Sequence, residues 1–219
     1  AWENEPGRIY QGHTAGLACD WWGGRWREDL GNASEDGQNA HRFSIEWSRI
    51  QPAPDQWDES ALDFYRDMLR GMSEMGLTPM VTLHHFTDPL WIYEMGGWEN
   101  DRTPHFFEKF LRHVVLALKD DVNLWATINE PNILAVNSYV EGCFPPGKKD
   151  ISAAFHALKN LIRGHALAYH AIHELQPQAM AGYTLHYRGF FPKREWLPLD
   201  HWAANALKGS VNEVFAHAI

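Results

Sequence analysis

The segment Trp125-Ala126-Thr127-Ile128-Asn129-Glu130-Pro131-Asn132 joins an apolar run to polar residues that are suited to chemistry. The apolar run predicts a buried strand that ends near Asn129 and Glu130, and Pro131 lacks the backbone donor needed to extend it. A carboxyl group held beside aromatic walls is partly desolvated, so it can stay protonated near neutral pH and act as a general acid. For the tripeptide Asn-Glu-Pro alone, a solvated glutamate at a strand end is the more common explanation, so these residues by themselves do not establish a catalytic role.

Two more predicted strands carry polar residues of interest. Arg42 lies within the stretch Ala40–Trp47, and His85 ends the stretch Thr78–His85. An arginine on a strand is usually an ion-pair partner, and Glu46 is close enough in sequence to be that partner. A single histidine on a strand is more often structural. If the strands are parallel, however, their carboxyl ends share one edge of the sheet, where active sites of α/β barrels are found.

Four short apolar or β-branched stretches are typical of buried strands. Helical patterns lie between and around them, and the alternation of strand and helix is typical of a parallel α/β sheet. The predicted strands are Ala40–Trp47, Thr78–His85, Val122–Ile128 and Ala179–Leu185. The predicted helices are Ala15–Leu30, Ser60–Met75, Pro104–Lys119 with Thr103 as its N-cap, Ser152–Leu175 and Trp202–Ala218.

The spacing of these strands indicates the size of the fold. They start near positions 41, 78, 122 and 179, so successive starts are 37, 44 and 57 residues apart. Eight such units would need roughly 370 residues, which is within the range of an elaborated eightfold barrel. We therefore predict an α/β protein with a (β/α)8 TIM barrel of which this chain holds about half, as a single partial domain over residues 1–219. Because no initiator Met is present and the last residues continue a helical pattern, we expect a fragment.

Composition excludes several functional classes. The chain has 19 basic and 28 acidic residues, a net charge of −9, and no Lys/Arg run, so we expect no nucleic-acid partner. No apolar stretch is long enough to span a membrane. No signal peptide is recognisable, and we expect a cytoplasmic protein. Cys19 and Cys143 are too few for a cysteine-ligated zinc site. His165, His170 and His173 share a predicted helix, but their spacing favours a helix surface over a metal site.

Three separated motifs resemble glycoside hydrolase family 1, the β-glucosidase-like retaining glycosidases. Residues 125–131 (WATINEP) resemble the acid/base motif of that family, and residues 42–50 (RFSIEWSRI) resemble its second-strand motif. Residues 81–86 (VTLHHF) with Pro89 resemble its third-strand segment, and Gly96-Gly97-Trp98 resembles the loop that follows. The resemblance covers roughly residues 15–190 and implies that the chain holds strands two to five of the barrel.

The resemblance also implies a reaction and the residues that perform it. The expected activity is retaining hydrolysis of terminal non-reducing β-D-glycosides, of the β-glucosidase or β-galactosidase type, with a β-glycoside or oligosaccharide as substrate and with no metal or other cofactor. Glu130 would be the general acid/base, and Asn129 would contact the 2-hydroxyl of the sugar. His85 would bind hydroxyls of the innermost sugar, and Arg42 would orient the nucleophilic carboxylate.

The sequence departs from the family pattern where the second carboxylate is needed. A retaining glycosidase uses two carboxylates about 5–5.5 Å apart. The nucleophile segment of the family, Thr-Glu-Asn-Gly, is absent, as is its first-strand glutamine, and Phe86 stands where many members have Trp. We therefore expect this chain alone to be inactive, and to self-associate through open sheet edges. The alternatives are a catalytically silent sugar-binding or interaction half-barrel and, less favoured by the motifs, an inverting hydrolase.

Overall fold

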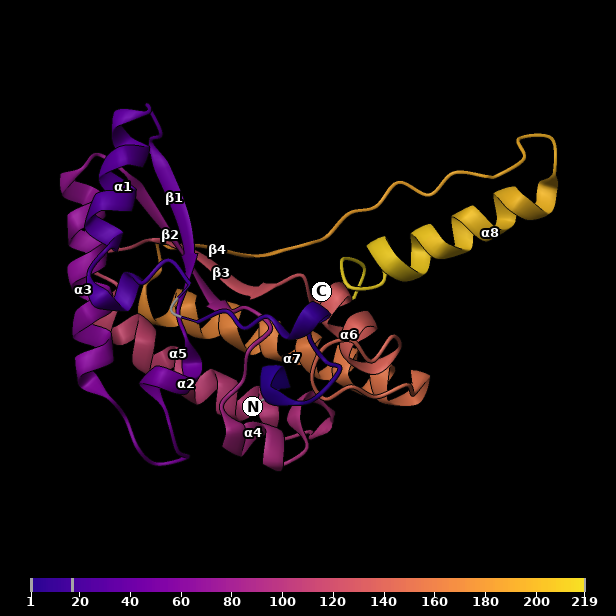
Figure 1. The fold of residues 1–219 in the computed structure, drawn as a ribbon, viewed down its shortest axis with the longest axis horizontal. Helices are drawn as coiled ribbons and strands as arrows, with labels where there is room; N and C mark the ends of the chain where they lie inside the picture. The colour runs from indigo at the N-terminus through magenta and orange to yellow at the C-terminus, as the bar shows by residue number, and fades with distance from the viewer. Residues whose placement is uncertain (1, 17, 219) are drawn as a thin grey trace.

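The computed structural model describes residues 2–16 and 18–218 and contains one parallel sheet. Its strands follow the chain in the order β1-β2-β3-β4, so each strand pairs with its sequence neighbour (Figure 1). This order confirms the predicted α/β architecture with successive βα units. The strands are β1 Ala40–Ser44, β2 Thr78–His84, β3 Leu124–Asn129 and β4 Met180–Thr184.

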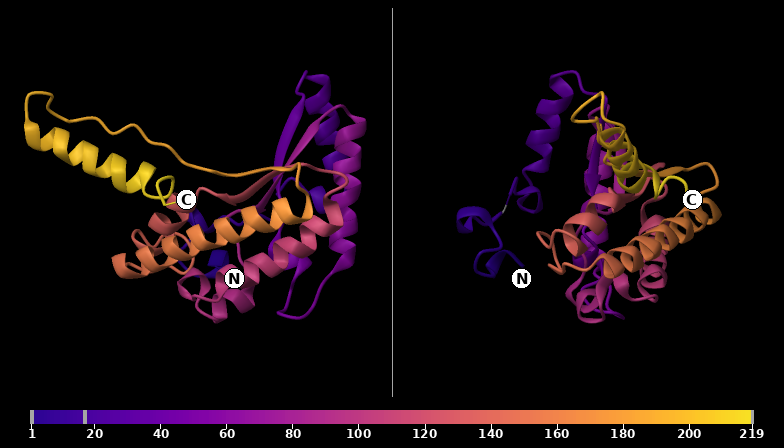
Figure 2. Two further views of the ribbon diagram at one scale, coloured as in Figure 1. Left: turned by 180° about the vertical axis from the view of Figure 1, so that it is seen from behind. Right: turned by 90° about the vertical axis from the view of Figure 1, so that its right-hand side faces the viewer.

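Helices connect the strands, α3 and α7 pack against the sheet, and α5 packs against both of these helices (Figures 1 and 2). Asp58 and Asp150 begin α3 and α7 by accepting hydrogen bonds from the first free backbone N–H groups of each helix. The α-helices are α1 Trp26–Glu35, α2 Trp47–Ile50, α3 Glu59–Glu74, α4 Leu90–Glu94, α5 Thr103–Leu118, α6 Pro131–Tyr139, α7 Ile151–Leu175 and α8 Pro198–Lys208. Short 3₁₀ turns cover Trp2–Asn4, Tyr10–Gly12, Trp21–Gly23 and Gly97–Glu99, and a π-helical turn covers Gly209–Glu213.

The core lies between the sheet and these helices and is rich in aromatic residues. Trp47 is completely enclosed, stacks on Phe110 of α5 with ring centroids 5.0 Å apart, and donates its indole N–H to Gln51. Trp125 of β3 is equally buried, and its N–H finds an acceptor in Gln176. Much of the aromatic content of the sequence therefore serves packing, with the polar tips of the rings satisfied.

The terminal helices differ from the prediction. The first helix begins at Trp26 and not at Ala15, because Asp20 and Gly24 have left-handed backbone angles that a helix cannot contain. The last helix ends at Lys208 and gives way to a π-helical turn. Thr103 does not act as a capping side chain for α5, since its hydroxyl donates to the carbonyl of Gly97 at 2.6 Å.

The segment after β4 forms an arm that extends from the body of the molecule and returns through α8 (Figures 1 and 2). This arm carries several exposed apolar side chains, and that of Trp196 is 76% exposed. The C-terminal end of the arm is anchored to the body, because Phe215 is buried and packs on Tyr183 of β4 with ring centroids 4.8 Å apart. The other exposed apolar residues of the arm are Tyr187, Phe191, Leu199, Trp202 and Leu207.

β1 and β4 are the two edges of the sheet, as the prediction of an open half-barrel requires. Apolar strand residues are less exposed than that prediction implied, since Leu83 and Trp125 are buried under the helices. Met180 of β4 is the exception among them, with 62% of its surface exposed. Among the described residues, no helix is both long and apolar enough to cross a membrane.

Candidate active site

Glu130 occupies the junction between β3 and α6. Its backbone is left-handed (φ 43°, ψ 59°), and its N–H donates to the carbonyl of Thr184 at the end of β4. Pro131 then starts α6 in the first helical position, where no backbone donor is needed. A left-handed conformation is strained for a residue with a Cβ atom, and such strain is concentrated at functional sites. The side chain of Glu130 remains 30% exposed, so its carboxyl group is accessible.

Asn129 and Arg42 meet directly. The guanidinium of Arg42 donates to the side-chain oxygen of Asn129 at 3.0 Å, and the hydroxyl of Thr184 donates to the same oxygen at 2.8 Å. Asn129 is only 2% exposed, so this oxygen is well satisfied within the fold. Strands β1, β3 and β4 thus contribute Arg42, Asn129 and Thr184 to one polar cluster. The sequence analysis did not identify Thr184 as part of it.

His85 lies immediately after β2 and is half-buried beside this cluster. One ring nitrogen, Nδ1, is 2.7 Å from the hydroxyl of Ser44 on β1. Burial lowers the pKa of His85, and the nearby positive charge of Arg42 lowers it further, while Glu130 acts in the opposite direction. A neutral ring can both donate and accept hydrogen bonds. Contacts with side chains of β1 thus hold Asn129 through Arg42 and His85 through Ser44, and Glu130 directly follows Asn129 in the chain.

Glu46 is not the ion-pair partner of Arg42 that the sequence suggested. Its carboxylate accepts hydrogen bonds from the hydroxyls of Thr87, at 3.0 and 3.2 Å, and Ser48, at 2.8 Å. Its backbone N–H donates to the hydroxyl of Tyr65, and burial raises the pKa of that phenol. The guanidinium of Arg42 instead contacts the side-chain oxygen of Asn129.

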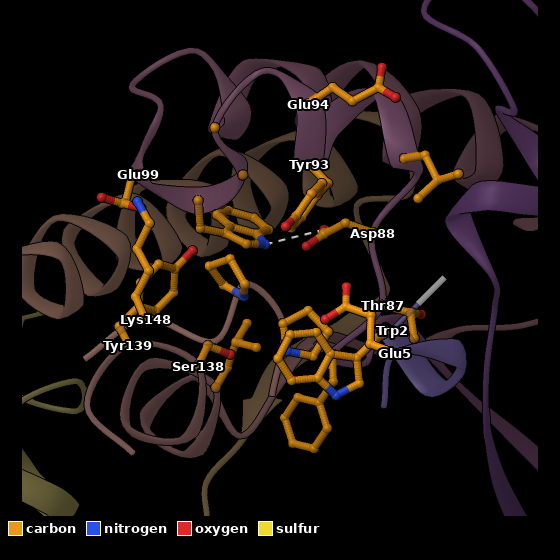
Figure 3. Close-up of a pocket in the computed structure, with 18 residues that line it drawn as sticks. Trp2, Glu5, Thr87, Asp88, Tyr93, Glu94, Glu99, Ser138, Tyr139 and Lys148 are labelled. Carbon is orange, nitrogen blue, oxygen red and sulfur yellow. Dashed lines mark hydrogen bonds and ion pairs between the residues drawn. The ribbon is translucent and has the colours of Figure 1, made fainter. Parts of the chain in front are cut away.

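A hollow of about 530 Å³ lies between the loop after β2 and the second half of α6 (Figure 3). Phe86 lines it and also meets the ring of His85 edge-on, with centroids 4.9 Å apart. Lys148 pairs with Glu99 on its wall. None of the four predicted site residues lines this hollow, so it is a neighbour of the candidate site. Its other aromatic and acidic lining residues are Trp2, Tyr93, Trp98, Tyr139, Glu5, Asp88 and Glu94.

The structure explains two of the histidines that carry no predicted role. His84 is buried and contacts Asp88 through Nε2 at 3.0 Å, and the indole of Trp98 donates to the same carboxylate oxygen. His165 is not on a helix surface as predicted: it is buried, and its Nδ1 is 2.8 Å from the hydroxyl of Thr127. Within the described residues, no three His, Cys, Asp or Glu side chains are placed to hold one metal ion.

The fold and the edge cluster together define half of a (β/α)8 barrel with polar side chains at the ends of its strands, and the comparisons with known proteins agree. The family model "Glycosyl hydrolase family 1" matches residues 1–219. The chain therefore belongs to glycosyl hydrolase family 1.

Individual relatives lead to the same family. β-Glucosidase A of Thermotoga maritima is 35% identical over 191 residues, which is 87% of this chain and 43% of the relative. The cytosolic β-glucosidase of Homo sapiens is 33% identical over 77% of this chain and 36% of its own length. The solved family 1 β-glucosidase from Thermotoga maritima superimposes with a TM-score of 0.93 at 32% identity, covering 96% of this chain and 48% of that one. The chain thus spans about half the length of the relatives it matches.

Proposed function

We propose that this chain is the part of a retaining β-glycosidase that carries the acid/base catalyst, acting on terminal non-reducing β-D-glycosides of the glucoside or galactoside type. The observation that supports this most strongly is Glu130, an accessible carboxyl group on strained backbone at the end of β3. Asn129, Arg42 and His85 accompany it at the same edge of the sheet.

Glu130 acts twice in the proposed reaction. In the first step a carboxylate from the other half of the barrel attacks the anomeric carbon, and Glu130 gives its proton to the departing oxygen as the glycosidic bond breaks. In the second step the ionised Glu130 removes a proton from water, whose oxygen attacks the same carbon and releases the first carboxylate. Glu130 ends protonated, as it began, so the cycle closes.

The other three residues hold the substrate and the nucleophile. Both hydrogen bonds to the side chain of Asn129 use its oxygen, so its NH₂ group is available to donate to a sugar hydroxyl. Neutral His85 offers its remaining ring nitrogen, Nε2, to a second hydroxyl. The guanidinium of Arg42 supplies positive charge beside the nucleophile, which favours the ionised form of that carboxylate.

The chain alone lacks the nucleophile that this scheme requires. The Thr-Glu-Asn-Gly segment does not occur in the 219 residues, so no glycosyl-enzyme intermediate is expected to form without the remaining half of the barrel.

The test is Glu130→Gln in the full-length protein that contains this segment, with Glu94→Gln at the exposed end of α4 as the matched control. Loss of the proton donor should lower kcat/KM for alkyl glycosides by about 10²–10⁴-fold. An activated aryl glycoside should be affected far less, because its leaving oxygen needs little protonation. Equal losses on both substrates would show that Glu130 is not the acid/base catalyst. If the unmodified full-length protein binds sugars but turns none over, the catalytically silent alternative is favoured.

A further inference from the structure

His186 follows the neighbouring strand β4 and faces Glu130, the proposed catalyst. It lies two residues beyond the end of β4, and its Nδ1 is 3.6 Å from Oε1 of Glu130. This separation is slightly longer than a hydrogen bond. Catalytic hydrogen bonds are often long in structures without substrate and shorten when the complex forms. No motif in the sequence drew attention to His186.

Arg188 contacts the other ring nitrogen of His186. The guanidinium Nε of Arg188 is 2.9 Å from Nε2 of His186. A guanidinium only donates hydrogen bonds, so Nε2 must be the acceptor and carries no proton. The ring is therefore the neutral tautomer with its proton on Nδ1, the nitrogen that faces Glu130. An Nδ1–H group can only donate to Oε1 of that carboxyl group.

Two buried asparagines hold the backbone of His186 and Arg188 in place. Asn132, 3% exposed, donates from its amide to the carbonyl of His186 at 2.8 Å. Asn212, 1% exposed, accepts from the N–H of Arg188 at 3.0 Å and donates to its carbonyl at 2.7 Å. Asn132 is only two residues from Glu130, so it ties the start of α6 to the segment after β4. The exposed side chain of Arg188 is thus attached to a well-held main chain.

We propose that His186 is a positioning residue for Glu130 and that Arg188 sets its tautomer. The Nδ1–H of His186 donates to Oε1 of Glu130. The transferable proton of Glu130 is therefore carried by Oε2. This inference rests on the proposed acid/base role of Glu130 for its consequence, but the arrangement of Arg188, His186 and Glu130 can be tested without any catalysis.

The first test is the imidazole ¹H–¹⁵N spectrum of His186 above pH 7.5 in the full-length protein that contains this segment, with ¹⁵N-labelled histidine and with His186→Asn for assignment. The Nδ1–H tautomer should dominate in the wild-type chain. In Arg188→Met, which keeps the length of the side chain and removes the donor, the population should shift toward the Nε2–H tautomer. A dominant Nε2–H form in the wild-type chain, or an identical spectrum in Arg188→Met, overturns the proposal.

The second test compares His186→Asn with His186→Gln in the full-length protein. The Asn amide nitrogen stands near the position of Nδ1, whereas that of Gln stands near Nε2. His186→Asn should keep kcat/KM on a poor leaving group within about threefold of wild type. His186→Gln should lose about tenfold on that substrate and much less on an activated one. His170→Gln, on the exposed face of α7, is the control and should change neither.

The pattern of results separates the two proposals. Equal losses for the Asn and Gln variants, or losses that do not depend on the leaving group, mean that His186 is structural and overturn its positioning role. If Glu130→Gln loses the same activity on poor and activated leaving groups, the proposed function fails. The tautomer measurement still tests the arrangement of Arg188, His186 and Glu130.

Discussion

At the scale of single residues, the left-handed backbone of Glu130 costs stability but places the carboxyl group that the proposed reaction needs. Its left-handed backbone lets β3 end and α6 begin within one residue, and this places the carboxyl group at the edge of the sheet. Neighbouring hydrogen bonds enforce this conformation, since the N–H of Glu130 is held by Thr184 and its carbonyl accepts from Ile133 and Leu134. A residue without a Cβ atom would adopt the same conformation at less cost.

Glu130→Gly should therefore be more stable than Glu130→Ala, although both remove the carboxyl group. The expected difference in free energy of unfolding is about 1 kcal/mol, because the left-handed conformation penalises only the alanine. Urea denaturation of both variants measures it. As a control, Leu134→Gly should be less stable than Leu134→Ala, since Leu134 lies inside helix α6. Equal stability of Glu130→Gly and Glu130→Ala would mean that the backbone at position 130 is not strained.

At the scale of elements, α7 is fastened to the sheet by a buried polar contact. The hydroxyl of Thr127 on β3 donates to the carbonyl of Gly182 on β4 at 3.0 Å, so it accepts from Nδ1 of His165 on α7. The rings of Tyr183 and Phe215 surround that histidine, and burial lowers its pKa. A protonated ring would leave a new donor without a partner in this position.

Acid should therefore weaken the fold through His165. The unfolded chain binds a proton below about pH 6.5, while the folded chain resists protonation, so the free energy of unfolding falls as pH decreases from 7.5 to 5.5. His41 and His85, whose pKa values burial also lowers, act in the same direction. His165→Asn keeps a donor for Thr127 but cannot titrate, so its loss of stability over this range should be smaller. His170→Asn, exposed on the same helix, should behave like wild type; equal slopes for all three proteins would contradict this account.

The elements that could be predicted are those in which local pattern and packing agree. Apolar runs located all four strands, and the helical pattern of Ser60–Met75 located α3 to within one residue at each end, because these signals lie within a few residues of one another. The terminal helices were misplaced, since turn conformations at Asp20 and a tertiary contact of Asn212 override the helical pattern. Similarly, Asn129 and Glu130 are recognisable from a contiguous motif, whereas the contributions of Thr184 and His186 arise only when β4 lies beside β3.

At the scale of the whole molecule, the chain presents a sheet with two open edges and an arm with exposed aromatic residues. In a closed barrel every strand has two neighbours, and sheet edges are absent. Exposed strand edges and apolar patches promote association with another chain. Because the chain spans about half the length of its relatives, a second half-barrel would supply both the missing neighbours and the missing carboxylate.

The 219-residue chain by itself should therefore be larger than a monomer in light scattering and should not hydrolyse a chromogenic β-glucoside. Trp196→Ser and Trp202→Ser together should reduce its association, because these side chains are among the most exposed apolar groups of the arm. Trp125→Ser, by contrast, removes a buried ring and should unfold the chain. A monomer whose turnover disappears in Glu130→Gln would show that this half of the barrel contains its own nucleophile.

The most direct measurement of the central claim is the anomeric form of the glycosyl azide made by Glu130→Ala in the full-length protein. Without the base, water attacks the glycosyl-enzyme slowly, but azide needs no deprotonation and attacks from the face that the acid/base catalyst occupied. With an activated β-glycoside and sodium azide, proton NMR should show the β-glycosyl azide together with a restored rate. An α-glycosyl azide would identify Glu130 as the nucleophile, and no azide product with an unchanged rate would show that Glu130 takes no part in the reaction.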